Sequence, residues 1–534
     1  MAAATALVAA TALLSSVSGA QTPARVASAA KPTRGGSVTY GLEAETSGGW
    51  CIPQSQLAIS GIMVASAIYD TLTVPNSTGK IVPYLAKSVA HDPTYSQWTI
   101  TLRDGIKFHD GTPLTADAVK QNIDAWRKGR LLGFVFTDIT DVAVVDPLTV
   151  KVTTSRPWVT FDGFLYLDGR AGIAAPAQLD NPDTCPTNLI GTGPFMIYNG
   201  AGHWTQNQEF VASRNPNYWQ KDQYGTQLPY LDKITFKPNP DAEQRLNQLQ
   251  AGQLDVMHTT SGQVMEQLGG LTGQVNQMRE KPGRREVRYY LLNAAKPPFD
   301  DVNARRAAAY ALDTDQLNQI RNAGQLHPAD QVFDTKVMGH LANPGYPKFN
   351  LAKAKQLVKT YKDAHGGEFN VVIETTNDPE NSAEAQLIKQ QFSKAGINGT
   401  LQQEDQASLI NTALGGNFSL LLWRNHPGDD PDGQYVWWTE TSPINFGKFK
   451  DPQLQSLLDQ GRSETDPAKR KAIYEQVTKI FGQQVYNLWS YWEQWDIASN
   501  PKVQGLMGPP LPDEGGTAEF LFGRHPLLGI WVKR

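Results

Sequence analysis

The chain has 534 residues, of which 40% are hydrophobic and 19% charged, with a formal net charge of -4 and a sequence pI near 6.2. One hydrophobic core does not normally extend over so long a chain, so at least two folded units are expected. Nucleic-acid-binding proteins carry an excess of Lys and Arg that contact the phosphates, and this chain has a weak negative charge instead. We therefore expect no nucleic-acid partner.

The first 36 residues are typical of an export leader followed by a flexible tether. Residues 2–14 are an uncharged run of Ala, Val, Leu and Thr, too short for the roughly 20 residues of a bilayer span. Small residues suit cleavage after Ala20 or after Ala29, and residues 21–36 have a linker's composition. The usual basic n-region is missing, so an upstream start and a disordered Ala-rich tail stay open as alternatives. No Cys stands at the junction, and we expect no lipid anchor there.

Cys51 and Cys185 are the two cysteines of the sequence. In the oxidising compartment to which a leader directs a protein, an isolated pair favours one disulfide, and two buried free thiols are the alternative. A bridge would tie the first strand region to the loop before Gly191.

Strand patterns open the chain. A first strand is predicted at residues 37–42, and apolar and polar residues alternate over 98–102 with the period of a half-buried strand. Asp104-Gly105 supplies a turn, and a second alternation follows over residues 106–108. This pattern predicts a β-hairpin.

Two helices are predicted in the rest of the first half. Thr115 is a good N-cap for a helix whose apolar stripe ends at Trp126. Asp241 caps a second helix that ends before Gly252, and a buried strand is predicted over residues 254–257.

The second half keeps the alternation of helices and strands. We predict a helix from Asn350, a β-branched strand over 371–375 and a helix over 382–395. Asp466-Pro467 combines an N-cap with Pro at the first helical position and opens a long helix. Alternating elements of this kind indicate an α/β fold with sheets that are at least partly parallel.

Motifs for catalysis, metals and cofactors are missing. The nine His residues form no close pair, there is no Cys cluster, and Gly-x-Ser-x-Gly is absent. Residues 77–80 lack the earlier Gly of a phosphate loop. The glycines of residues 191–193 precede Pro194 rather than a helix, which argues against dinucleotide binding. We expect no enzyme activity, no cofactor and no metal site.

Residues 86–126, AKSVAHDPTYSQWTITLRDGIKFHDGTPLTADAVKQNIDAW, closely resemble the signature of the family 5 extracellular solute-binding proteins. This family includes the oligopeptide-, dipeptide- and nickel-binding subunits of ABC importers. Further segments match in the same order: Tyr69–Leu72, Gly191–Phe195, Asn215–Trp219, Leu228–Asp232, Asn293–Asp313 and Tyr435–Gly505. The resemblance covers almost the whole chain after the leader.

The resemblance implies a periplasmic-binding-protein-like fold of type II, with mixed sheets flanked by helices and a ligand enclosed between two hinged lobes. Lobe I would comprise residues 37–72, 190–292 and 500–534. Residues 73–189 would be an extra subdomain inserted in it, and residues 293–499 would form lobe II. Closure would let the ligand bridge both lobes.

Residues 423–432 correspond to the family's segment that lines the cleft on the second lobe. In the peptide binders a carboxylate three residues after the Trp holds the ligand's α-amino group, whereas His426 stands at that position here. This departure argues against peptide specificity, because a neutral imidazole or Arg424 suits an uncharged or anionic solute. Asp429 could slide into the missing role, and a plain solvated turn over 429–433 is the alternative. The candidate ligand contacts here are Trp423, Arg424, His426 and Asp429.

Aromatic residues crowd into positions 489–495 and supply the apolar area and polar handles that small-ligand sites use. Because strand side chains alternate, half of them are expected in the core. Position in the family favours Tyr491 and Trp492 as ligand contacts. Three residues match the family's contact region on the first lobe, with plain surface positions as the alternative: Glu43, Glu45 and Trp50.

The function implied is that of an exported monomeric subunit, periplasmic or at the cell surface, which captures a small solute and delivers it to an ABC permease. The alternatives are a secreted hydrolase of peptides or glycans and a ligand sensor on the same fold. The identity of the solute stays open.

Overall fold

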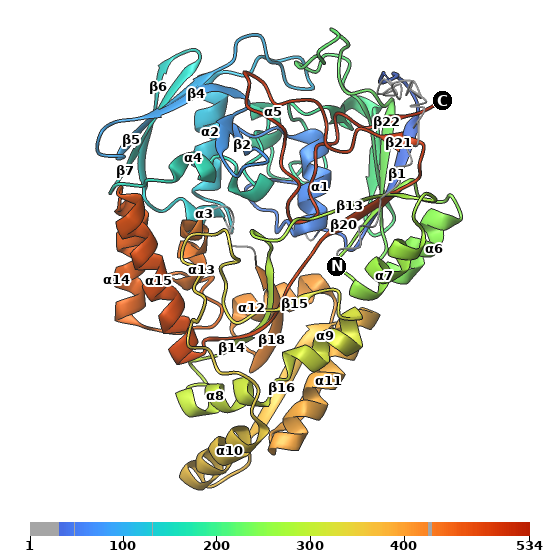
Figure 1. The fold of residues 1–534 in the computed structure, drawn as a ribbon. Coiled ribbons are helices and arrows are strands. Elements are labelled where there is room, and N and C mark those ends of the chain that lie inside the picture. The colour runs from blue at the N-terminus through green and yellow to red at the C-terminus, as the bar shows by residue number, and fades with distance from the viewer. Residues whose placement is uncertain (1–30, 47, 131, 426–429) are drawn as a thin grey trace, which may run out of the picture.

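The computed structural model describes residues 31–46, 48–130, 132–425 and 430–534 (Figure 1). Three larger sheets and their flanking helices make up the molecule, and the predicted mixed α/β architecture is confirmed. The leader predicted within the first 30 residues lies outside the described residues.

The first sheet gathers strands from both ends of the chain. Its order is β13-β20-β12-β1-β11-β10-β8, with β9 paired to β10. Strand β1 runs parallel to β11 and β12, and the other pairs are antiparallel. The strands are β1 Ser37–Leu42, β8 Phe195–Met196, β9 His203–Thr205, β10 Glu209–Arg214, β11 Lys233–Pro238, β12 Val256–Thr259, β13 Asn276–Arg279 and β20 Asp496–Ser499.

The second sheet forms the core of the lower part of Figure 1. Its order is β15-β19-β14-β18-β16-β17. Strand β16 is parallel to β17 and β18, while β14 is antiparallel to β18 and β19. The strands are β14 Val287–Leu292, β15 His327–Pro328, β16 Asn370–Thr376, β17 Asn398–Glu404, β18 Leu420–Asn425 and β19 Asn487–Trp492.

The third sheet is antiparallel, with the strand order β4-β5-β7-β6. Its strands are β4 Ala86–His91, β5 Gln97–Leu102, β6 Ile139–Asp146 and β7 Thr149–Thr154. The hairpin predicted over residues 98–108 is wrong, because β5 pairs with β4 and β7 instead. Ile106 and Phe108 are buried within a turn whose only ladder contact in the described chain is the isolated bridge from Lys107 to Pro113. Their alternation reflects that burial rather than a strand.

Two two-stranded ribbons complete the strands. They pair β2 Thr73–Pro75 with β3 Ile81–Pro83, and β21 Val503–Gln504 with β22 Trp531–Val532. Between β21 and β22 the chain crosses in front of helix α1 (Figure 1).

The helices cover the sheets, with α6 and α7 beside the first and α8 to α11 around the second (Figure 1). Their bounds are α1 Ile59–Ile68, α2 Ala116–Trp126, α3 Leu132–Val135, α4 Phe161–Phe164, α5 Pro176–Leu179, α6 Ala242–Gln250, α7 Gly262–Gly270, α8 Val302–Ala311, α9 Thr314–Asn322, α10 Leu351–His365, α11 Pro379–Ala395, α12 Gln406–Gly415, α13 Tyr435–Trp438, α14 Pro452–Ser463 and α15 Pro467–Gln484. Three short 3-10 helices are η1 Leu167–Gly169, η2 Tyr198–Gly200 and η3 Pro431–Gln434.

The predicted helix starts are explained by side-chain caps. Thr115, Asp241, Asn350 and Asp466 each accept a hydrogen bond from a backbone N–H of the first turn. Helix α11 begins at Pro379 rather than at Ser382, because Asp378 caps it and Pro occupies its first position.

The two cysteines form a disulfide, the first of the two alternatives that the sequence left open. It closes a separation of 134 residues and ties the loop after β1 to the segment that follows α5.

Candidate functional site

Two short connections join the first sheet to the second. One spans residues 280–286, between β13 and β14, and the other spans 493–495, between β19 and β20. Two backbone hydrogen bonds hold them side by side: Glu280 N to the Trp495 oxygen at 2.8 Å, and Glu493 N to the Glu286 oxygen at 2.9 Å. Paired connections of this kind are where two-lobed proteins bend.

Arg424 bridges the two sheets next to this hinge. It lies near the end of β18, and its Nη2 forms an ion pair with the carboxylate of Glu43, which follows β1. Its Nε lies 3.5 Å from Glu286 Oε1, and its guanidinium lies over the ring of Trp495. The Arg424 side chain is still 22% exposed, so part of it is accessible to solvent.

Burial and the Arg424 charge set the ionisation of the neighbouring acids. Burial disfavours the charged form of Glu43, but Arg424 outweighs it and lowers the pKa of Glu43 to about 2. Burial raises the pKa of Glu286 to about 7, in spite of the same Arg. Burial also lowers the pKa of His258 to about 3, so its neutral Nε2 accepts the hydrogen bond that Glu43 N donates at 2.9 Å. At neutral pH the site therefore holds a firmly ionised Arg424–Glu43 pair.

Trp423 precedes Arg424 in β18, so its side chain points to the opposite face of the strand. Trp423 is half-buried and faces Tyr289 across the β14–β18 ladder. The buried ring of Phe446 lies 5.0 Å from Trp423 and 5.7 Å from Trp437. These rings form an aromatic cluster on that face of the strand.

Arg170 lies directly after η1 and was not found by reading the sequence. Its Nε donates to the Leu57 carbonyl at 3.1 Å and its Nη1 lies 3.6 Å from Asp168. Burial lowers the pKa of Arg170, while the negative charges of Asp168 and Glu286 oppose that shift. One sequence signal was available: a single cation within the mainly apolar stretch 161–175.

The loop after β18 is only partly described. His426 and Asp429, both predicted contacts, lie outside the described residues. The solvated turn considered over 429–433 is wrong for the part that follows them, because Asp432 is completely buried. Asp430 pairs with Arg470, and Asp432 accepts from Arg462, Trp158 and Thr160. Both carboxylates are therefore engaged in holding the protein together.

Glu45 and Trp50 make their contacts within the first sheet, whereas Glu43 pairs with Arg424. Glu45 Oε2 accepts from Trp204 Nε1 at 3.3 Å and from Asn207 N at 3.2 Å, and so anchors the β9–β10 turn. Trp50 is completely buried against Trp204 and Phe210. In this conformation both residues support the first sheet.

Tyr491 and Trp492 are buried at the end of β19. The Tyr491 hydroxyl donates to Glu384, which also receives Arg288 Nε, and Arg288 Nη1 donates to Glu493 at 3.1 Å. This buried network and Ser261, which follows β12 of the first sheet, line one small polar cavity. Trp492 lies under the guanidinium of Arg285. The structure thus places Tyr491 and Trp492 at the end of β19, directly before the connection 493–495.

The described part of the chain contains neither a membrane-spanning helix nor a cluster of metal ligands. No helix there combines the length and apolar character needed to cross a bilayer. In the same residues, no three His, Cys, Asp or Glu side chains come together as ligands for a metal ion.

Comparison with known proteins agrees with this geometry. The family "Bacterial extracellular solute-binding proteins, family 5 Middle" matches residues 80–446. The nickel-binding periplasmic protein of Escherichia coli K12 is 25% identical over 481 residues, which cover 84% of this chain and 88% of the relative. The probable D,D-dipeptide-binding periplasmic protein DdpA of the same strain is 25% identical over 80% of this chain and 83% of its own length.

Solved structures share the fold. The periplasmic binding protein AgaA of A. tumefaciens R10, in complex with agropinic acid, superposes with a TM-score of 0.81 at 25% identity, covering 93% of this chain and 99% of its own. DppA of Helicobacter pylori, in complex with the peptide STSA, superposes with a TM-score of 0.81 at 20% identity, covering 94% and 99%. The chain, with its two sheets joined by a paired hinge, belongs to the bacterial extracellular solute-binding proteins of family 5, the substrate-binding subunits of ABC importers.

Proposed function

We propose that this protein captures a small solute carrying a carboxylate or another anionic group, and that Arg424 binds that group between the lobes. The observation that carries the proposal is the position of Arg424: it is partly exposed, it belongs to the second sheet, and it reaches Glu43 of the first. The contacts of a side chain that touches both lobes change when the lobes open or close. A solute bound there favours the closed form by the difference in its affinity for the two forms.

The charges on the described walls favour an anion over an amine. Arg170 of the inserted subdomain and Arg424 of lobe II each have about a quarter of the side chain exposed. Asp430 is paired with Arg470, and an anionic solute would share Arg424 with Glu43. The relative AgaA, which was solved with agropinic acid, is in keeping with an acidic solute.

Trp423 and its neighbours are candidates for the apolar contacts of the solute. The half-buried rings of Trp423 and Trp437 offer apolar area on the face of β18 opposite to the Arg424 side chain. Rings of this kind can cover the uncharged part of an anionic solute. His426 and Asp429 stay candidates for the contacts that distinguish one such solute from another.

The remaining parts of the proposal concern organisation and delivery. Residues 37–72, 190–279 and 496–534 form lobe I, with 73–189 inserted as a subdomain, and 287–492 form lobe II. These limits follow sheet membership and shift the predicted boundaries at 293 and 499 to the two hinge connections. The protein acts outside the cytoplasm as a monomer and docks on a membrane permease after closing.

A solute panel tests this proposal. Unfolding midpoints are measured for the purified protein with agropinic acid, glutathione, a neutral sugar and the peptide Ala-Ala, since a ligand of the native state raises the midpoint by mass action. An acidic solute should raise it, and titration calorimetry should show at least about a tenfold weaker affinity for Arg424→Gln, a loss of about 1.4 kcal/mol. Arg306→Gln, a change on helix α8 where the guanidinium donates to the Gln483 carbonyl, is the matched control. A neutral sugar that binds equally well to wild type and Arg424→Gln would overturn the anion assignment.

A further inference from the structure

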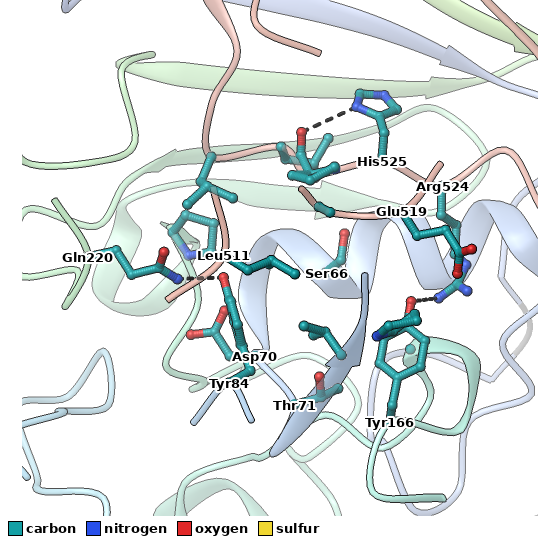
Figure 2. Close-up of a pocket in the computed structure, with 18 of the residues that line it drawn as sticks. Ser66, Asp70, Thr71, Tyr84, Tyr166, Gln220, Leu511, Glu519, Arg524 and His525 are labelled. Carbon is teal, nitrogen blue, oxygen red and sulfur yellow. Dashed lines mark hydrogen bonds between the residues drawn. The ribbon is translucent and has the colours of Figure 1, made fainter. Parts of the chain in front are cut away.

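A second cavity lies inside the first lobe, between helix α1 and the returning tail. Figure 2 shows its walls: Ser66 and Asp70 on one side and the tail residues Leu511 and Arg524 on the other. Its volume is about 130 Å³. All of its described lining residues fall within 62–84, 166–220 and 509–528. No strand of the second sheet contributes, so this cavity is separate from the site around Arg424.

The middle of the cavity is apolar. Ile62, Val74 and the tail residues Leu521 and Leu527 line it, together with several prolines. A cavity of about 150 Å³ with apolar walls is large enough to take up a benzene molecule. The size therefore corresponds to about one aromatic ring.

Polar groups stand at two ends. At one end Gln220 Nε2 donates to the hydroxyls of Tyr84 and Tyr218, which leaves Gln220 Oε1 as an acceptor. At the other end Arg524 Nη1 donates to the Tyr166 hydroxyl, while the buried Arg524 Nε makes no hydrogen bond. A buried donor without a partner is costly, and a ligand oxygen in the cavity would remove that cost.

The acids in the walls already have partners. Asp70 accepts hydrogen bonds from Thr192, Tyr218 and Trp219, and burial raises its pKa to about 6. Glu519 forms an ion pair with Arg284. Burial lowers the pKa of His525 to about 4, so its imidazole is neutral at pH 7. Because these acids are already paired or hydrogen-bonded, the cavity favours a neutral guest, since a charged one would lose its hydration without gaining a counter-ion.

We infer that lobe I holds a second binding site, between α1 and the tail, for a small neutral molecule of about one aromatic ring with a hydroxyl or carbonyl oxygen. The ring occupies the apolar middle, and the oxygen accepts from Arg524 Nε. Because the site lacks residues of the second sheet, its occupancy does not depend on capture of the transported solute.

The test uses para-fluorophenol as the probe and fluorine NMR as the readout on the full-length protein. The wild type should bind the probe saturably with one site. Ser66→Phe fills the cavity from α1 and should weaken binding at least about tenfold. Leu511→Phe fills it from the half-exposed tail without altering α1, so it gives an answer even if Ser66→Phe fails to fold.

Two controls separate this site from the cleft. Ser456→Phe places the same ring on an exposed position of helix α14, and Trp423→Ala removes a candidate contact of the cleft. Both should bind the probe as the wild type does, with circular dichroism showing that every variant is folded. The inference is overturned if the wild type shows no saturable binding, if Leu511→Phe binds normally, or if Trp423→Ala abolishes binding.

Discussion

Arg462 joins helix α14 of the proposed lobe II to Asp138 of the proposed inserted subdomain, and its replacement by Met gives the sharpest prediction of stability. Its Nε donates to Asp432 at 3.0 Å and its Nη1 donates to Asp138 at 2.9 Å, while the guanidinium stacks 3.8 Å from the Tyr435 ring centre. Only 1% of the Arg462 side chain and none of Asp432 is exposed. In Figure 1, helices α14 and α15 lie directly below the third sheet, where this contact forms.

The expected loss in the free energy of unfolding depends on which acid loses its partner. Asp138 keeps its bond from Arg156 at 2.9 Å, whereas Asp432 loses its counter-charge while buried. Removing one partner of a buried ion pair costs about 3–5 kcal/mol. Because Trp158 and Thr160 still donate to Asp432, we expect the low end, about 3 kcal/mol.

Urea unfolding of Arg462→Met at pH 7.5 measures this loss. Lys471→Met is the matched control, because Lys471 is exposed and pairs with Glu475 on the same helix, a contact worth less than about 1 kcal/mol. A double-mutant cycle with Asp432→Asn should return a coupling of more than about 1 kcal/mol. If Arg462→Met lowers the free energy of unfolding no more than Lys471→Met does, the contact does not hold the subdomain to the second lobe.

Three further predictions concern the hinge, a helix cap and the disulfide. Burial raises the pKa of Glu280 to about 8, so the folded state holds a proton that the unfolded chain releases near pH 4.5. The resulting stability is present below pH 4.5 and is lost as the pH rises to about 8; Glu280→Gln should flatten that part of the urea-midpoint profile, and an unchanged slope contradicts the assignment. Asp378→Ala removes the α11 cap to Asn381 N and should cost about 1 kcal/mol in urea unfolding, whereas Asp378→Ser should restore most of it. Replacing Cys51 and Cys185 together by Ser should lower the free energy of unfolding by about 3 kcal/mol. Reduction of the wild type should reproduce that shift, and a reduced wild type as stable as the oxidised one would refute it.

Local sequence signals predicted the starts of helices α2, α6, α10 and α15, because a cap acts within one turn. The carboxylates of Asp241 and Asp466 accept from N–H groups three residues along the chain, so residue type and spacing suffice to identify them. The true start of α11 carries the same kind of signal, because Asp378 is an N-cap and Pro379 follows it at the first helical position. The false hairpin shows the limit: burial of Ile106 and Phe108 within a turn produces the same alternation as a strand.

The candidate site could be predicted only in part. Family position led to Glu43, Trp423 and Arg424, which the structure brings to the hinge, but it also led to Glu45 and Trp50, which support the first sheet. Arg170 has no neighbouring motif, because its environment is made by Leu57 and Glu286, both distant in sequence.

By itself the sequence determined the α/β class, the capped helices and, through its motifs, membership of a solute-binding family. Tertiary structure alone decided which charges are available to a solute. Asp430 and Asp432 stand in the predicted contact segment, yet each is neutralised by an Arg some 30 to 40 positions away, and Glu43 is neutralised by Arg424. Coulomb interactions depend on distance in space and on burial, and neither can be read from spacing along a chain.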